Sequence, residues 1–240
     1  MKLVIILIIC LMFSIALASD KAITSADEAV AKALEYTGFG KSKDFTRSER
    51  ISDICQLLTT TDTTNSILAD EVRNRSAWQV KLHDVSLHLK GNTPEGITLG
   101  PVDFVIVIDS LTGIPLRISS IPKEPFERDT ASAEQVKNLS WGFKGLPSEL
   151  PTISLFDLFN KCKFYPAIAK SIIVIYVLYS RDDSPPEPAW ALYLRGLPSR
   201  HGNNDTKNEY LTTERRIYNA VTGFGLWNDN FPYPLLSNDK

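Results

Sequence analysis

The first clear pattern in the chain is helical. Apolar residues recur at helical spacing in one short stretch: Ala26, Ala29, Val30, Ala33 and Leu34. Thr24 or Ser25 provides an N-terminal cap for such a helix. Asp27 and Glu28 stand in its first turn, where the helix dipole favours acidic side chains. Gly38 is a suitable residue to end it. The pattern therefore predicts one amphipathic helix that ends before Gly38.

Farther along, the pattern changes to the alternation typical of strands. Trp78, Val80 and Leu82 alternate with polar residues, which predicts a half-buried strand. Residues 104–108 are more uniformly apolar and predict a more buried strand. The pair Thr112-Gly113 predicts a turn in which glycine takes a positive φ. We also expect further elements over 114–118 (strand), 132–139 and 155–161 (helices), and 172–179, 190–195 and 215–220 (strands). Residues 41–75 are not clearly assigned: Ile51, Ile54, Leu57 and Leu58 fit a short helix, and a strand is the alternative.

Three short sequences occur twice in the same order. They are Ser25-Ala26-Asp27 with Ser132-Ala133-Glu134, Trp78-Gln79-Val80 with Trp190-Ala191-Leu192, and Asp109-Ser110-Leu111-Thr112-Gly113 with Asn219-Ala220-Val221-Thr222-Gly223, at shifts of 107, 112 and 110 residues. Such repetition predicts a duplicated module. Pro122 and Pro125 favour an extended connection between the copies, which gives modules over residues 19–121 and 122–240. We predict an α+β protein in which each module is a helix packed on a small antiparallel sheet.

The first copy resembles a known domain family. Ala29 to Gly38 forms a helix with spaced alanines, Trp78 opens a strand, and the segment from Val105 ends in Asp109, Thr112 and Gly113. Together these features resemble the PepSY domain, which occurs in secreted peptidase propeptides and in exported bacterial proteins. The second copy diverges, because Asn219 replaces the aspartate while Thr222 and Gly223 are kept. The resemblance implies tandem modules with a binding or peptidase-inhibitory role, and it transfers no active-site residues.

The start of the chain predicts export. Lys2 precedes a run without charge from Leu3 to Leu17, and Ala16-Leu17-Ala18 is the small-x-small pattern that a signal peptidase cuts. The run is shorter than the roughly 20 apolar residues that cross a bilayer. We therefore predict a signal peptide over residues 1–18, no membrane span after its removal, and a secreted, periplasmic or cell-envelope location.

Charge and cysteine content refine this interpretation. The net charge of the whole chain is -2, and it becomes -3 when residues 1–18 and their Lys2 are removed, so we expect no nucleic-acid partner. Cys55 and Cys162 remain after processing. In an oxidising compartment they are candidates for a disulfide bond, and the alternative is that both are buried thiols.

Several residue patterns could indicate a catalytic or ligand-binding site. Gly40-Lys41-Ser42 resembles the end of a phosphate-binding loop, but its preceding glycine is replaced by Glu35 and it follows a helix. His83 and His88 fall on opposite faces of a strand, which disfavours a shared metal. The acidic pair Asp182-Asp183 fits a solvated turn. We therefore predict no catalytic, cofactor-binding or metal-binding residues.

These observations favour an exported, non-enzymatic binding protein with a protein or peptide partner and no cofactor. Two alternatives belong to other classes: an exported hydrolase with an unrecognised site, and a structural component of the cell envelope. We expect Trp78 and Trp190 to anchor the protein core instead of stacking on a ligand. A deep pocket with convergent titratable groups would favour the hydrolase, and an open face without such groups would favour the binding protein.

Overall fold

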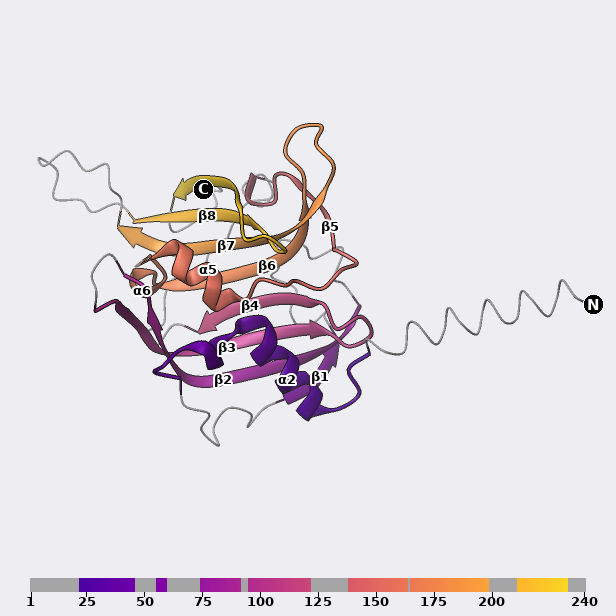
Figure 1. Ribbon diagram of the computed structural model, residues 1–240. Helices are drawn as coiled ribbons and strands as arrows, with labels where there is room; N and C mark the ends of the chain where they lie inside the picture. The colour runs from indigo at the N-terminus through magenta and orange to yellow at the C-terminus, as the bar shows by residue number, and fades with distance from the viewer. Residues whose placement is uncertain are drawn as a thin grey trace, which may run out of the picture.

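The structure of the protein, a computed structural model, describes residues 22–45, 55–59, 74–91, 95–121, 138–163, 165–198 and 211–232. Within these ranges eight strands form one antiparallel sheet in the order β1-β2-β3-β4-β6-β7-β8-β9, and β5 pairs with β6 beside this path (Figure 1). The strands are β1 (Cys55–Thr59), β2 (Ser76–Leu89), β3 (Ile97–Asp109), β4 (Pro115–Ile121), β5 (Phe143–Gly145), β6 (Ser171–Tyr179), β7 (Glu187–Pro198), β8 (Leu211–Asn219) and β9 (Gly225–Pro232). A single sheet thus runs through both halves of the chain.

The prediction of an α+β protein with two repeated modules, each a helix on its own small sheet, is wrong. Among the described residues, strands make up 50% and helices only 19%, and eight of the strands follow one another in a single antiparallel sheet. The halves are joined by three residue pairs between β4 and β6: Arg117 with Ile175, Ile118 with Val174, and Ser119 with Ile173. In a separate first sheet, β4 would be an open edge with unpaired backbone groups. Pairing with β6 satisfies those groups, and the hydrophobic pattern of β4 alone does not reveal its partner.

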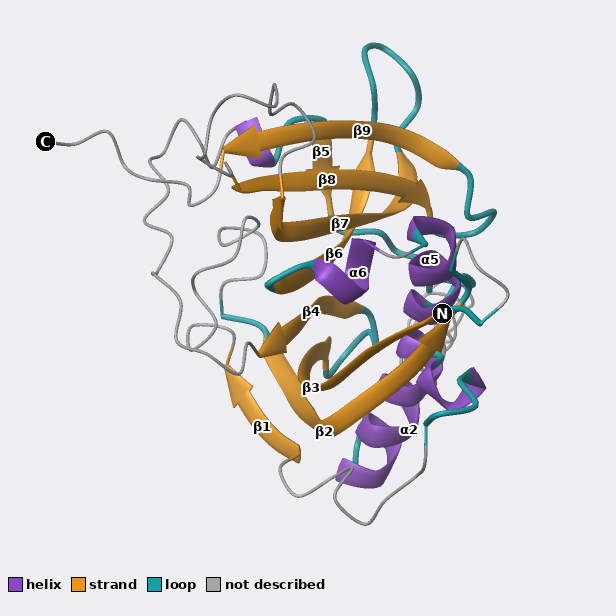
Figure 2. Cartoon of the chain, turned by 90° about the vertical axis from the view of Figure 1, so that its left-hand side faces the viewer, coloured by secondary structure: helices purple, strands orange, loops and turns teal. Residues whose placement is uncertain are grey.

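The helices lie on one face of this sheet. They are α2 (Ala26–Thr37), the 3-10 helix η1 (Phe39–Lys41), α5 (Leu155–Cys162) and the short α6 (Tyr165–Ile168). Figure 2 shows α2 and α5 on the same side of the strands. α2 packs against β2 and β3, α6 packs against β3 and β7, and α2 contacts α5 directly. We call the opposite side of the sheet, which these four helices do not cover, the open face.

The predicted first helix is confirmed as α2, and its ends have local causes. The Ser25 side chain accepts a hydrogen bond from the backbone N–H of Glu28 at 3.2 Å, which satisfies one of the unpaired donors of the first turn. Gly38 has φ 62° and donates its N–H to the carbonyl of Leu34, which closes the last turn. Helix boundaries of this kind depend on residues a few positions apart, so the sequence predicts them well.

The larger core lies between the helices and the sheet. Three phenylalanines from different segments meet there: the ring centroids of Phe39 and Phe104 are 4.9 Å apart, and that of Phe159 lies 6.4 Å from each. All three side chains are fully buried. A smaller cluster on the open face includes Tyr179, Tyr193 and Ile217. None of the helices in the described ranges is both long enough and apolar enough to cross a membrane.

Several predictions lie outside the described residues. They are the signal peptide over 1–18, the prolines at 122 and 125, and residues 132–137 of the second predicted helix. The helix predicted over 155–161 is confirmed as α5. The side chain of Ser154 caps α5 by accepting from the N–H of Asp157 at 3.3 Å. Ser154, and not Ser132, therefore stands in the place that Ser25 has before α2.

Local features do recur around the two tryptophans. The indole Nε1 of Trp78 donates to the carbonyl oxygen of Ile23 at 3.0 Å, and that of Trp190 donates to Ile153 at 2.8 Å. Each acceptor lies just before the capping serine of a helix. Trp190 is fully buried, whereas Trp78 is partly exposed. Both tryptophans connect a helix start to the sheet, as expected for residues that anchor a core.

The turns after β3 and β8 also share one hydrogen-bond pattern. Asp109 Oδ1 accepts from the N–H groups of Leu111 and Thr112, and Asn219 Oδ1 accepts from those of Val221 and Thr222. Gly113 and Gly223 follow with φ 67° and 68°, a conformation that glycine adopts without strain. The repeated sequences 109–113 and 219–223 thus form equivalent turns, as their residue types suggested.

The Asp109 turn predicts a pH-dependent stability. Burial by itself raises the pKa of Asp109, but hydrogen bonds from Arg75, Thr112 and Leu111 outweigh it and hold the pKa below its usual value. A depressed folded pKa gives stability that is present above the unfolded pKa and is lost as the pH falls through the folded pKa. Asp109→Asn should keep the turn, as Asn219 does, but lose the 2.8 Å pair with Arg75. Urea unfolding at pH 7 should show a loss of roughly 1–2 kcal/mol that shrinks in acid.

Asn219→Asp is the matched control for this experiment. The Asn219 amide donates a hydrogen bond to the Glu187 carboxylate, so an aspartate there would place two negative charges together. It should destabilise the protein at pH 7, and acid should relieve the effect as the new pair takes up a proton. A loss for Asp109→Asn that stays the same from pH 7 down to pH 2 would contradict the assignment.

Candidate ligand-binding pocket

The open face carries a pocket of about 440 Å³ near β8 and β9. Its lining comes from four segments of the chain: Asn138, Trp141, Arg181, Asp182, Arg215, Trp227, Asp229 and Phe231. Trp227, Asp229 and Phe231 alternate along β9 and therefore point to the same face. Trp227 and Phe231 pack against the apolar cluster of the open face, on the side away from the helices.

Two tryptophans form one wall of the pocket. The ring centroids of Trp141 and Trp227 are 5.6 Å apart with an interplanar angle of 51°. The guanidinium of Arg181 lies over the Trp227 ring, 4.4 Å from its centroid, which is a cation–π contact. Trp141 is 45% exposed, which is unusual because so large an apolar side chain is normally buried. The wall therefore offers a flat aromatic surface to solvent.

The floor of the pocket is held by an ion pair between neighbouring strands. Arg215 Nε donates to Asp229 Oδ1 at 2.9 Å, and Nη2 donates to Oδ2 at 2.6 Å. Arg215 Nη1 also donates to backbone carbonyl oxygens, at 2.6 Å for Leu139 and 3.3 Å for both Asn138 and Trp141. Burial by itself lowers the pKa of Arg215, but the hydrogen bonds with Asp229 outweigh it and raise the pKa. Arg215 thus fixes the segment that carries Trp141 to β8.

Tyr179 lies beside the pocket wall. Its ring meets Trp141 edge-on, with centroids 6.4 Å apart and an angle of 71°. A side chain at Gly142, where φ is 84°, would overlap the Tyr179 ring, so glycine is needed for this close approach. Burial is the largest cause that raises the pKa of Tyr179, although Arg215 and Arg181 oppose it. The hydroxyl therefore stays protonated at neutral pH and can donate a hydrogen bond.

The sequence reasoning missed most of this pocket. Asp182 was considered only as part of a solvated turn, and Trp141, Arg215, Trp227 and Phe231 were not singled out at all. The usable signal was the alternation of Trp227, Asp229 and Phe231, which has the period of a strand. The other lining residues come from distant segments, and they meet only when β6, β7, β8 and β9 pair in this order within one sheet.

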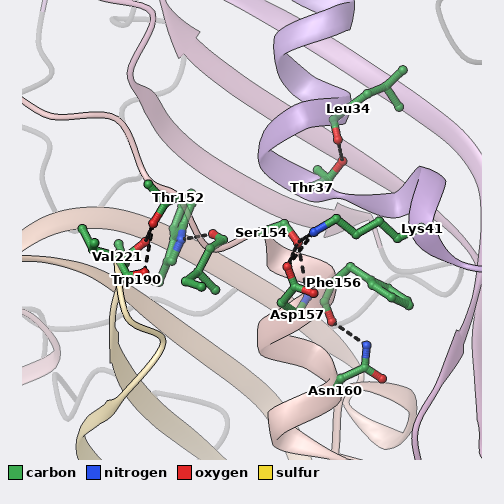
Figure 3. A network of polar contacts seen from close by, with 12 residues as sticks. Leu34, Thr37, Lys41, Thr152, Ser154, Phe156, Asp157, Asn160, Trp190 and Val221 are labelled. Carbon is green, nitrogen blue, oxygen red and sulfur yellow. Dashed lines mark hydrogen bonds and ion pairs between the residues drawn. The ribbon is translucent and has the colours of Figure 1, made fainter.

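A second polar cluster joins the ends of α2 and α5 (Figure 3). Lys41 Nζ lies 2.7 Å from Asp157 Oδ2 and 3.3 Å from Ser154 Oγ, and the Ser154 hydroxyl donates to Asp157 at 2.6 Å. A serine beside a lysine is one form of catalytic dyad, which the hydrolase hypothesis would use.

The geometry of this cluster favours a structural role. Ser154 is 6% exposed and caps α5, and a side chain at Gly38 would overlap its Oγ, so substrate has no access to it. The Lys41 ammonium group is paired with the Asp157 carboxylate, so it already has a partner within the cluster. Burial by itself raises the pKa of Asp157, but hydrogen bonds from Lys41 and Ser154 lower it. The cluster ties the two helices together.

His83 and His88, the two candidate metal ligands, contact different aspartates. His83 Nδ1 is 3.1 Å from Asp103 Oδ2, and His88 Nδ1 is 3.6 Å from Asp44 Oδ2. Within the described ranges, no group of three or more histidine, cysteine or acidic side chains is arranged to hold a metal ion.

The two cysteines do not occupy equivalent places. Cys55 begins strand β1, whereas Cys162 is the last residue of helix α5. Cys162 is a buried free thiol whose Sγ lies 3.4 Å from the Tyr218 hydroxyl. Burial raises the pKa of this thiol despite that hydrogen bond. The side chain of Cys55 lies outside the described residues, and because Cys162 is free, the predicted disulfide between them is not formed in the structure.

Comparison with known proteins adds no relative. No protein-family model matches the chain, and no curated protein sequence or solved structure does so. The functional argument therefore depends on the geometry of the pocket.

Proposed function

We propose that this protein is exported and acts as a non-enzymatic binding protein, which holds a protein or peptide partner at the pocket between Trp141 and Trp227. The observation that carries the proposal is the exposure of Trp141 beside a second tryptophan on the open face. Exposed tryptophan is enriched where proteins bind one another, because its ring contributes a large contact area at a small cost in side-chain entropy.

The charged groups of the pocket also suit binding. Arg215 and Asp229 are committed to each other, and Arg181 is stacked on Trp227 with its Nε 3.5 Å from Asp182. These side chains shape and orient the aromatic surface. The apolar run up to Leu17 followed by Ala18 supports export.

A selection experiment tests this proposal. Peptides from a random displayed library would be selected on purified protein that begins at Ser19, and their affinities measured for Trp141→Ala. Truncation of this central aromatic residue should lower the affinity for the selected peptides roughly 30-fold or more. Phe224→Ala is the matched control, because Phe224 is 72% exposed but lies in the turn after β8 and does not line the pocket. Selected peptides that bind equally well to Trp141→Ala would contradict the proposal.

A further inference from the structure

Two hydrogen-bond donors at the pocket have no acceptor. Among the described residues, the Tyr179 hydroxyl and the Trp227 indole Nε1 are buried polar atoms without a partner. Trp227 lines the pocket, and the Tyr179 ring lies 6.4 Å from that of Trp141, which also lines it. Buried donors are normally paired, because an unpaired one has lost its hydration without compensation. The pocket therefore lacks an acceptor that a ligand would bring.

The charge of the pocket limits what that acceptor is. Its lining contains two arginines and two aspartates, which cancel: Arg181 lies near Asp182, and Arg215 is paired with Asp229. A phosphate or carboxylate would meet Asp182 and Asp229 as well as the arginines. A neutral acceptor, such as a backbone carbonyl oxygen, avoids this repulsion and satisfies a phenol or indole donor.

The aromatic surface limits the rest of the ligand. Three aromatic rings line the pocket, those of Trp141, Trp227 and Phe231, and such rings suit compact apolar groups. Arg181 lies over the Trp227 ring and Arg215 over the Phe231 ring, so the exposed Trp141 contributes most of the available surface. A proline ring has such a shape, and its residue has no N–H that would need a partner there. Extended proline-rich segments also expose their carbonyl oxygens to the solvent, because the polyproline II helix has no internal hydrogen bonds.

We infer that the pocket binds a proline-rich segment in the polyproline II conformation. This inference rests on the proposed function and names its ligand class. Proline rings pack on Trp141, Trp227 and Phe231, and carbonyl oxygens accept from Trp227 Nε1 and the Tyr179 hydroxyl. Aromatic grooves recognise such segments by this combination of ring packing and hydrogen bonding. Trp141 contacts the rings of both Tyr179 and Trp227, so an outward turn of its exposed side chain opens the way to the donors.

Paired synthetic peptides test the inference. Each probe is a labelled twelve-residue peptide with blocked ends and the pattern Pro-x-x-Pro, and its partner has alanine in place of each proline. Fluorescence anisotropy should detect binding of Pro-x-x-Pro probes, with the alanine partners at least roughly tenfold weaker. Equal binding of the two sets, or no binding of either, would overturn the inference.

Tyr179→Phe separates a hydrogen bond to ligand from a structural role. The substitution removes only the unpartnered hydroxyl, so affinity for the Pro-x-x-Pro probes should fall roughly 3- to 10-fold while the thermal midpoint of the free protein stays level or rises. Unchanged affinity would contradict the assignment of this donor.

The two proposals fail in different ways. If random-library peptides without proline bind in a Trp141-dependent manner and the Pro-x-x-Pro probes do not, the proline inference is wrong and the binding proposal stands. If only oligosaccharides on a glycan array bind in that manner, both are wrong, since sugar rings also stack on tryptophan.

Discussion

Replacement of Arg215 by methionine is expected to lower the free energy of unfolding by about 3–5 kcal/mol. The Arg215 side chain is 1% exposed, and it donates to both oxygens of Asp229 and to three backbone carbonyl oxygens. Its removal leaves the Asp229 carboxylate and these carbonyl oxygens without their hydrogen-bond donor at a site that water reaches only in part. Because Asp229 is 27% exposed, water can recover some of the loss, which favours the lower end of the range.

Denaturant unfolding of a double-mutant cycle would measure this contribution. Arg215→Met combined with Asp229→Leu removes both charges, and much of the stability should return, as it does when apolar residues replace a buried ion pair. Arg181→Met is the matched control. Its side chain is 55% exposed, so its loss should cost no more than about 1 kcal/mol. Equal losses for Arg215→Met and Arg181→Met would show that Arg215 is not the support of the pocket.

The second large effect is expected at Trp190. Trp190→Ala should cost about 3–5 kcal/mol, because the substitution leaves a cavity in the larger core and removes the hydrogen bond to Ile153. The ring of Trp190 is fully buried and lies 5.0 Å from that of Tyr176. Trp190→Phe should cost less than Trp190→Ala, since it keeps most of the apolar contact and loses chiefly the hydrogen bond.

Trp78→Ala is the informative comparison for Trp190→Ala. Trp78 makes the same kind of hydrogen bond, to Ile23, but its side chain is partly exposed, so a smaller loss is expected. Urea unfolding of both variants, followed by far-UV circular dichroism, would give the two values. If Trp78→Ala were the more destabilising of the two, burial would not be what sets the importance of these residues.

The pocket shows why a candidate site was hard to predict. Trp141, Arg181, Arg215 and Trp227 lie on four segments, and no spacing along the chain links them. Arg215 looked like an ordinary charged residue at the start of a predicted strand. Its importance comes from Asp229 on the next strand and from the carbonyls of residues 138, 139 and 141. Asp229 becomes a neighbour of Arg215 when β8 and β9 pair, whereas residues 138–141 reach it from the segment before β5.

The local features of this protein follow from neighbouring residues. The cap at Ser25, the stop at Gly38 and the turns at Asp109 and Asn219 depend on hydrogen bonds between residues at most four positions apart, so they could be predicted from neighbouring residue types. The pairing of β4 with β6, which makes one sheet in place of two modules, is seen only in the folded protein. A strand's alternation shows which side chains are buried, but its backbone groups are the same in every strand and do not select a partner.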